Sequence, residues 1–359
     1  MLIDALTSVS RSGTRAGANG APRREILAGV HGIILAGVHA WGADVLEHLI
    51  ARPLLPVADR PLIAHILTWL AEAGVRHTSV CANSDTSLLR KCLGDGSRWD
   101  VCLEYYEDVM PRGPAGCVRD AVVGTGAAAS VVVDGTIVPE VDLADVLARH
   151  RQSQAAMTVV AAEAGPDQAR GDSALRPLGI YVFSRSAWEQ VPEGGYQDIK
   201  EKLIPRLCEA GQTVALHAVS AHAAPRVSGV ASYLAVSRWA VRRLVSRSPL
   251  PAGYAAVGES VIHETADVHA GTRLAGPVLV GPHCRVQRGA IISGPTALGP
   301  GARIGASAIV SRSVLWSDCR VGEGALVDQS ILCDQARIGA GARIRNTIHI
   351  EARAGRRQL

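Results

Sequence analysis

The chain has 359 residues, of which 48% are hydrophobic and 19% charged, so it is long enough for two domains and too apolar for a disordered polyelectrolyte. Its formal net charge of +4 is too small to indicate nucleic acid as the main ligand, and no run of about 18 apolar residues predicts a membrane span. The eight cysteines form no C-x-x-C pair, which favours free thiols in a reducing, cytoplasmic compartment.

The chain begins with a segment that lacks hydrophobic periodicity. Residues 1–25 place arginines among Ser, Thr, Gly and Ala, a composition typical of a mobile tail. Over residues 26–232, short β-branched runs alternate with amphipathic stretches, as expected for an α/β domain. The predicted strands are 33–36, 75–82, 101–106, 130–134, 157–162, 180–183 and 213–219. The predicted helices are 61–73, 115–123, 142–153 and 199–210.

This alternation of strand and helix predicts a Rossmann-like, doubly wound sheet whose strands are mostly parallel. Pro61 stands at a favoured first-turn position of one helix, and Gly74 ends it. In such sheets, ligands bind beyond the carboxyl ends of the strands. We therefore expect a ligand site near the residues that follow those strands.

A six-residue period replaces helical periodicity near Val257. Aliphatic residues recur at every sixth position from Val268 to Val310, and a small or compact residue follows four positions after each of the first seven. The period skips near residues 311–315 and again before Ile338, where it resumes. It predicts a parallel β-helix over residues 257–359, in which each aliphatic side chain points into a narrow prism. Residues 233–256 are predicted to link the two domains, with a helix at their start whose arginines form a solvated face.

Several short motifs of the first domain resemble, in their order and spacing, those of the sugar-1-phosphate nucleotidyltransferases. The motifs are Gly32–Gly37, Arg52–Val57, Arg60–Ile63, Arg112–Gly116, Gly179–Phe183 and Asp198–Pro205. A C-terminal β-helix is common in the mannose-1-phosphate guanylyltransferase and glucose-1-phosphate adenylyltransferase branches, so the resemblance covers nearly everything after residue 26. It implies that the β-helix is left-handed.

The resemblance implies a reaction in which a sugar-1-phosphate oxygen attacks the α-phosphate of a nucleoside triphosphate and pyrophosphate leaves. Because this reaction brings anions together, the family uses a glycine-rich loop, cationic side chains and a magnesium ion held by carboxylates. By the same resemblance, Gly179 lies on the sugar side of the site. The nucleotide-binding residues that it implies are Leu35, Ala36, Gly37, Arg52, Gly113 and Gly116.

The phosphate-binding loop departs from the family pattern. Val38 replaces a glycine, and the family's Thr-Arg pair is missing from the stretch that contains His39. The family's lysine is Arg52 here, which keeps the charge but presents a planar guanidinium instead of a compact ammonium. Arg52 is the single candidate catalytic residue.

The metal site departs further from the family. Thr136 and Arg226 occupy the two positions where the resemblance places aspartates. Asp134 is a substitute candidate, but it lies two residues earlier on a strand and has a different reach. The family's Glu-Lys-Pro segment has no counterpart between Ala161 and Leu178. We therefore expect no metal site, and magnesium only if catalysis is retained.

Three functions remain open. The first is a non-catalytic regulatory or assembly subunit of sugar-nucleotide metabolism, which binds nucleotide or sugar nucleotide and forms a homo-oligomer or a hetero-oligomer with a catalytic paralogue. The second is an active sugar-1-phosphate nucleotidyltransferase with a reshaped site. The third is a β-helix acyltransferase, with His263, His269 or His283 as general base. Binding of acyl-CoA instead of nucleotide distinguishes the third from the others.

Overall fold

A computed structural model describes residues 29–37, 45–82, 86–108, 110–163 and 175–351. The described residues up to Arg226, apart from Pro56–Pro61, form a first compact unit. Pro56–Pro61 and the residues from Val227 onward form a second. The predicted tail, residues 1–25, and the loop residues Val38 and His39 lie outside the described residues.

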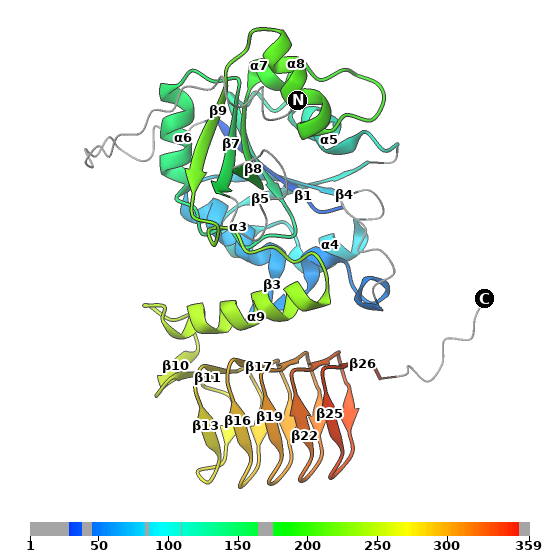
Figure 1. Ribbon diagram of the computed structural model, residues 1–359, viewed down its shortest axis with the longest axis vertical. Helices are drawn as coiled ribbons and strands as arrows, with labels where there is room; N and C mark the ends of the chain where they lie inside the picture. Colours follow the sequence, from blue (N-terminus) through cyan, green and yellow to red (C-terminus); the bar gives the residue numbers. More distant parts are fainter. Residues whose placement is uncertain (1–28, 38–44, 83–85, 109, 164–174, 352–359) are drawn as a thin grey trace, which may run out of the picture. The chain divides into compact units, whose positions relative to one another are not determined.

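The first unit is built on a seven-stranded sheet with the strand order β5-β4-β1-β6-β8-β7-β9. β1 pairs in parallel with β4 and β6, and β8 is antiparallel to both β6 and β7 (Figure 1). The sheet is therefore mixed but mostly parallel, as the sequence predicts. Its strands are β1 (Val30–Leu35), β4 (His77–Ala82), β5 (Cys102–Glu107), β6 (Ala129–Asp134), β7 (Met157–Glu163), β8 (Leu175–Ser184) and β9 (Val214–Val219).

Helices cover both faces of this sheet. On one face, side chains of α5, α7 and α8 share a buried core with Ile33, Val132 and Phe183. On the other, α3 lies against Gly32, and α6 hydrogen-bonds to Thr158 through His150. The α-helices are α3 (Leu62–Glu72), α4 (Ser87–Leu93), α5 (Gly113–Val122), α6 (Leu143–Gln152), α7 (Arg185–Trp188) and α8 (Ile204–Glu209). The shorter turns are η1 (Val45–His48), η2 (Arg52–Leu54), η3 (Ser97–Trp99) and η4 (Ile199–Leu203).

Two predicted elements differ clearly from the observed ones. The predicted strand 180–183 is the end of the longer strand β8, which begins at Leu175. The predicted helix 199–210 starts with a π-helical turn, η4, before α8 begins at Ile204. The start of η4 is capped, because the Asp198 carboxylate accepts hydrogen bonds from the backbone N–H groups of Lys200 and Glu201.

The second unit contains a three-sided prism of short strands, which confirms the predicted parallel β-helix. One side has the order β10-β11-β14-β17-β20-β23-β26, the second β12-β15-β18-β21-β24, and the third β13-β16-β19-β22-β25. All neighbours pair in parallel except β10 and β11. Figure 1 shows β13, β16, β19, β22 and β25 stacked as successive coils. The strands are β10 (Tyr254–Val257), β11 (Ser260–His263), β12 (Asp267–Val268), β13 (Arg273–Ala275), β14 (Val278–Val280), β15 (Arg285–Val286), β16 (Ile291–Ser293), β17 (Thr296–Leu298), β18 (Arg303–Ile304), β19 (Ile309–Ser311), β20 (Val314–Leu315), β21 (Arg320–Val321), β22 (Leu326–Asp328), β23 (Ile331–Leu332), β24 (Arg337–Ile338), β25 (Arg343–Arg345) and β26 (Ile348–His349).

The residues that repeat at every sixth position fill the interior of this prism. Val286, Ile292 and Ile304 belong to one buried cluster, together with the small residues Ala290 and Ala302 that the pattern places beside them. Small side chains are needed there because the large aliphatic chains from the other sides meet at the same level.

The skip in the six-residue period has a structural counterpart. Ile291 pairs with Ile309, but Ile309 pairs with Leu326, so the later coil is one residue shorter. The shortening falls between Ile309 and Val314, because Val314 already pairs with Ala297 in the new register. The coil is thus shortened at a corner of the prism. The inward-pointing residues on either side of this corner, Val310 and Leu315, both remain in the buried cluster.

The predicted linking helix is α9 (Val230–Val245), which begins three residues earlier than expected. Its residues Val241 and Leu244 pack with Val261, Leu279 and Ala297 on one side of the prism. Tyr233 of α9 donates a hydrogen bond to the Pro56 carbonyl and accepts one from the Trp316 indole. The hairpin β2 (Pro56–Val57) and β3 (Arg60–Pro61) therefore belongs to the second unit despite its early position in the chain. Among the helices that the structure describes, none is long and apolar enough to cross a membrane.

Candidate functional site

A cluster of polar residues lies at the carboxyl end of β6. Asp134 is the last residue of this strand and pairs in register with Leu35, the last residue of β1. Two residues further on, Thr136 donates hydrogen bonds to the Asp134 carboxylate from its backbone N–H at 3.0 Å and from its hydroxyl at 2.7 Å. This turn, in which an aspartate accepts from the residue two positions later, folds Thr136 back over Asp134.

Arg226 joins this cluster from the end of the first unit. Its guanidinium donates to the Asp134 carboxylate, to the Thr136 hydroxyl at 2.9 Å and to the Leu178 carbonyl at 3.0 Å. The backbone of Arg226 also forms an antiparallel bridge with Ile137. The sequence names Asp134, Thr136 and Arg226 as separate candidates, and the structure brings all three into direct contact.

The cluster keeps Asp134 ionised although it is buried. Burial alone would raise the pKa of the Asp134 carboxyl, but the adjacent Arg226 guanidinium and the hydrogen bonds from Arg226 and Thr136 outweigh burial and lower this pKa. The side chain of Asp134 is 11% exposed and that of Arg226 is 32% exposed. The two residues therefore form an ion pair in which the Asp134 side chain is the more deeply buried and the Arg226 side chain is partly exposed.

Two glycines make the close approach of these residues possible. At Gly135, an added Cβ would lie 2.9 Å from the Leu35 carbonyl oxygen and 3.1 Å from the Cα of Ala36. At Gly179, which has φ +84°, an added Cβ would meet the Arg226 guanidinium and would lie 3.0 Å from the Cβ of Asp134. Gly179, expected on the sugar side, thus lies directly beside this ion pair.

Gly113 and Gly116, expected in the nucleotide site, lie at the start of α5. Gly113 has φ +73°, and an added Cβ there would lie 2.6 Å from the Gln197 carbonyl oxygen. Gln197 accepts a hydrogen bond from the Ala115 N–H and donates one to the Arg112 carbonyl. Sequence reasoning missed Gln197, because it reaches this turn from a distant segment and no local pattern marks it.

The remaining four residues predicted for the nucleotide site are Leu35, Ala36, Gly37 and Arg52. Leu35 is buried, and the N–H of Ala36 donates to the Cys81 carbonyl at 2.7 Å, so the end of β1 is fixed between its neighbours. Gly37 is the last residue of its described range. Arg52 lies in η2 and is 8% exposed. The roles of these residues in nucleotide binding stay predictions.

The cluster does not fit a divalent metal ion. Magnesium takes oxygen ligands, usually from one or two carboxylates. At Asp134, one carboxylate oxygen accepts hydrogen bonds from Thr136 and the other accepts from the Arg226 guanidinium. Within the described ranges, no group of three or more His, Cys, Asp or Glu residues is arranged to hold a metal ion. The described residues of the site therefore supply a fixed organic cation in place of metal ligands.

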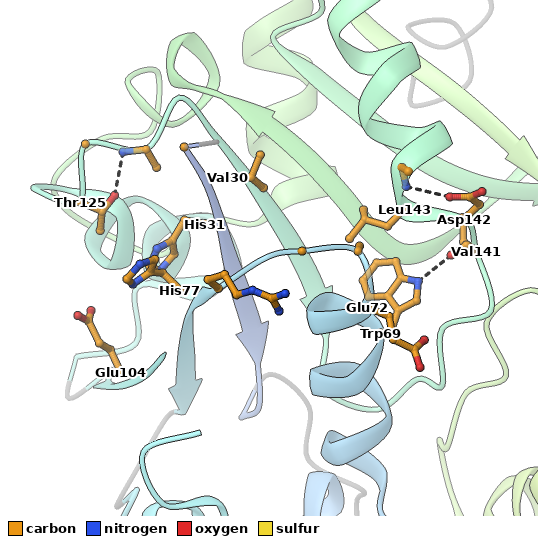
Figure 2. A pocket seen from close by; sticks show the side chains of 17 residues that line it. Val30, His31, Trp69, Glu72, His77, Glu104, Thr125, Val141, Asp142 and Leu143 are labelled. Carbon is orange, nitrogen blue, oxygen red and sulfur yellow. Dashed lines mark hydrogen bonds between the residues drawn. The ribbon is translucent and has the colours of Figure 1, made fainter. Parts of the chain in front are cut away.

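A pocket of about 870 Å³ lies at the opposite, amino-terminal ends of the strands. Figure 2 shows that His31 of β1 and His77 of β4 lie close together in it, on paired positions. Burial lowers the pKa of His31, although nearby Glu104 opposes this effect. Its ring shares a 2.8 Å hydrogen bond with the Ser79 hydroxyl. The pocket is thus distinct from the predicted nucleotide site, which lies at the carboxyl ends.

The histidines considered for acyl transfer make local contacts in the β-helix. His263 packs edge-on against Tyr254, with ring centroids 4.8 Å apart, and its Nδ1 accepts a hydrogen bond from the Thr265 N–H. The Nδ1 of His269 accepts from the Gly271 N–H at 2.9 Å. His283 occupies a prism corner with φ +56°. Each position has a structural explanation in the turns of the prism.

Comparison with known proteins matches both parts of the chain. A family model described as nucleotidyl transferase matches residues 32–171, and one described as GMPPB C-terminal domain matches residues 274–353. A mannose-1-phosphate guanylyltransferase of Mycobacterium tuberculosis is 25% identical over 272 residues, which are 70% of this chain and 75% of that protein. A glucose-1-phosphate thymidylyltransferase of Mycolicibacterium smegmatis is 38% identical over 87 residues, which are 24% of this chain and 30% of the relative.

The mixed α/β sheet followed by a β-helix defines a nucleotidyltransferase-type domain with a hexapeptide-repeat extension. In both of its parts, the chain is therefore similar to sugar-1-phosphate nucleotidyltransferases.

Proposed function

We propose that this chain is a non-catalytic member of its family, a regulatory or assembly subunit that binds a nucleotide or a sugar nucleotide. The observation that carries the proposal is the ion pair of Asp134 and Arg226, which also holds Thr136. Thr136 and Arg226 stand at the two positions where the resemblance implies aspartates that hold magnesium. The relatives are named as transferases, so the proposal concerns a change in activity within a shared fold.

The physical argument is one of charge. Transfer to a sugar phosphate requires neutralisation of the charge that develops on the α-phosphate and the leaving pyrophosphate. A divalent ion neutralises this charge and also orients both reactants. The Arg226 guanidinium is already neutralised by Asp134. Loss of several kcal/mol of transition-state stabilisation lowers the rate by several decades, because about 1.4 kcal/mol corresponds to a factor of ten.

The direct test is pyrophosphate release by the purified protein. A panel of nucleoside triphosphates and sugar-1-phosphates is supplied with magnesium or with chelator, beside an active transferase as a control. We expect no turnover above background in either condition. Turnover that disappears with chelator would instead support an active enzyme with a reshaped site. This result would contradict the non-catalytic proposal.

Nucleotide binding is tested separately by calorimetric titration with GDP, dTDP and their sugar conjugates. If Arg52 contacts the phosphates, Arg52→Ala weakens binding by about 1.5–3 kcal/mol, the range for a hydrogen bond to a charged group. Arg52→Lys, which restores the residue typical of the family, serves as the matched variant that keeps the charge. Equal affinity of all three proteins removes Arg52 from the binding site.

An assembly role also predicts an oligomer. The last coil of the prism ends with β25 and β26, and exposed strand edges are usually covered in native proteins. We propose contact with a second copy of this chain or with a catalytic paralogue through the β-helix. Light scattering of the protein alone, and mixed with a catalytic relative, tests the two arrangements. A strict monomer at micromolar concentration in both samples contradicts the assembly role.

A further inference from the structure

We infer that Arg226 is a built-in cation that takes the place of the divalent metal ion, so that this chain engages the diphosphate group of a free nucleotide and not a metal–nucleotide complex. This inference rests on the proposed function for its ligand, but its claim about the cation site stands on the contacts of Arg226. Arg226 contacts residues of two strands and the turn that follows one of them. β6 supplies Asp134, the turn after β6 supplies Thr136, and β8 supplies the Leu178 carbonyl.

The first argument is the exclusion of metal. An arginine side chain stays protonated at all ordinary pH values, so the guanidinium cannot release its charge to admit a second cation. A divalent ion that approached Asp134 would meet this fixed positive charge at contact distance. It would also have to displace the two hydrogen bonds from Thr136 to the same carboxylate.

The second argument is the donor capacity of the guanidinium. Arginine has five N–H donors, and the hydrogen bonds to described residues at Asp134, Thr136 and Leu178 use three of them. The side chain as a whole is 32% exposed, so it is not sealed inside the protein. Phosphate oxygens are the natural partners of a planar guanidinium fork, because two parallel N–H groups can bind them together. A nucleoside diphosphate, free or linked to a sugar, carries the required group.

The third argument is the glycine beside the guanidinium. At Gly179, any side chain would collide with Arg226, and the positive φ of +84° further disfavours other residues. The backbone of β8 therefore provides both the space for the guanidinium and, at Leu178, an acceptor that fixes its plane. An arginine that merely lay on the surface would need neither the space beside Gly179 nor the Leu178 carbonyl. This arrangement marks Arg226 as a positioned part of the site.

The inference is tested first by metal binding without nucleotide, with Mn²⁺ followed by electron paramagnetic resonance. Wild-type protein and Asp134→Asn are expected to bind Mn²⁺ equally weakly. The double variant Thr136→Asp, Arg226→Asp, which rebuilds the carboxylates that the resemblance implies, is expected to gain at least tenfold in Mn²⁺ affinity. The control is Arg149→Asp, which places a second exposed carboxylate beside Asp145 and reports non-specific binding.

Two outcomes overturn the inference. One is Mn²⁺ binding by wild-type protein that Asp134→Asn abolishes, and the other is a folded double variant with no gain over the Arg149→Asp control. Thermal melting establishes that each variant is folded. If the double variant does not fold, Arg226→Asn replaces it, because this change removes the cation and keeps Thr136 and its hydrogen bonds. A smaller gain in Mn²⁺ affinity over wild-type protein is then expected, because this variant removes the fixed cation but adds no carboxylate, and the absence of any gain overturns the inference.

The second test compares the affinity for GDP, dTDP and their sugar conjugates in magnesium with that in chelator. The inference predicts affinities within about twofold, and Arg226→Lys, which keeps the charge but loses the planar fork, is expected to bind at least fivefold more weakly. Binding at least tenfold tighter in magnesium overturns the inference while leaving the proposed nucleotide-binding role intact. Absence of binding in both conditions contradicts that proposed role, and the Mn²⁺ titration then decides the inference by itself.

Discussion

Arg226 donates a hydrogen bond to the carboxylate of Asp134, which lies 92 positions earlier in the chain. The two side chains are unequally buried, with 11% of Asp134 and 32% of Arg226 exposed. Removal of Arg226 leaves the buried carboxylate of Asp134 without its partner, whereas removal of Asp134 leaves the more exposed guanidinium of Arg226. The first change should cost more folding free energy, because the unpaired charge that it leaves is more deeply buried.

This asymmetry predicts the order of two substitutions. Arg226→Ala should destabilise the protein by about 2–4 kcal/mol, near the lower end for a buried pair because the guanidinium is partly exposed. Asp134→Asn should cost less, since the remaining cation can reach solvent. Calorimetric melting measures both, with Arg149→Ala as the control for an exposed ion pair, which should cost about 0.5 kcal/mol. A larger loss for Asp134→Asn than for Arg226→Ala would contradict this account.

We expect the buried His150 to make the free energy of unfolding decrease in acid. Its ring is buried between the Thr158 and Ser184 hydroxyls, and burial, assisted by nearby Arg151, lowers its pKa from 6.5 to about 4. Between these two values the unfolded chain binds the proton more tightly, so stability is full above pH 6.5 and decreases as the pH falls toward 4. The full effect is about 3 kcal/mol, since one pKa unit corresponds to about 1.4 kcal/mol.

The measurement for His150 is urea denaturation from pH 7 to pH 4. His150→Gln should reduce the pH dependence of stability in this range, because glutamine keeps hydrogen-bonding groups but takes up no proton. The exposed His222, substituted in the same way, is the control. A pH dependence that survives His150→Gln unchanged would assign the effect to other groups.

Two glycines of the β-helix form a matched pair. Gly305 and Gly339 directly follow Ile304 and Ile338, which occupy the same position in their coils. An added Cβ at Gly305 would lie 2.6 Å from the backbone nitrogen of Glu323 in the next coil, whereas at Gly339 it would have no atom of the described residues within 4 Å, apart from its chain neighbours. Gly305→Ala should therefore destabilise by about 1–3 kcal/mol through overpacking.

At Gly339 the same substitution should be neutral or stabilise by up to about 1 kcal/mol, because alanine restricts the unfolded chain. Thermal melting of the two variants side by side measures the difference. Equal melting temperatures would show that the coils do not stack as closely as the structure describes.

We expect three arginines at paired positions of the β-helix to make its stability depend on salt concentration. Arg303 pairs in register with Arg285 on one side and Arg320 on the other, and all three side chains are exposed. Like charges at directly paired positions repel, so Arg303→Glu should stabilise the β-helix by about 0.2–1 kcal/mol at low ionic strength. Most of this gain should vanish in 1 M salt, where screening is nearly complete.

The control for the column is Arg273→Glu. Arg273 is also exposed in the prism, but its paired position is occupied by Ile291. Denaturation at low and high salt should show a gain for Arg303→Glu that exceeds that of Arg273→Glu. No such excess would mean that the arginines avoid one another by bending into solvent.

The two domains differ in how far the sequence predicts them. In the β-helix, each coil repeats the same inward positions, so a period of six residues is enough to identify Val286, Ile292 and Ile304 as interior. In the α/β domain, the alternation of strands and helices predicts the elements but not their order in the sheet. The antiparallel placement of β8 beside β6 is an example, since its apolar sequence suits either direction.

The candidate site shows the same division. The sequence by itself determined the fold class and the interior of the prism, because both depend on residue type and spacing along the chain. That Thr136 and Arg226 stand at the metal positions of the family stays a prediction from the resemblance. Only the tertiary structure decided that Arg226 binds Asp134, that Gly179 makes room for it and that Gln197 covers Gly113. These contacts join segments far apart in sequence, and sheet topology, which no local pattern encodes, sets which of them meet.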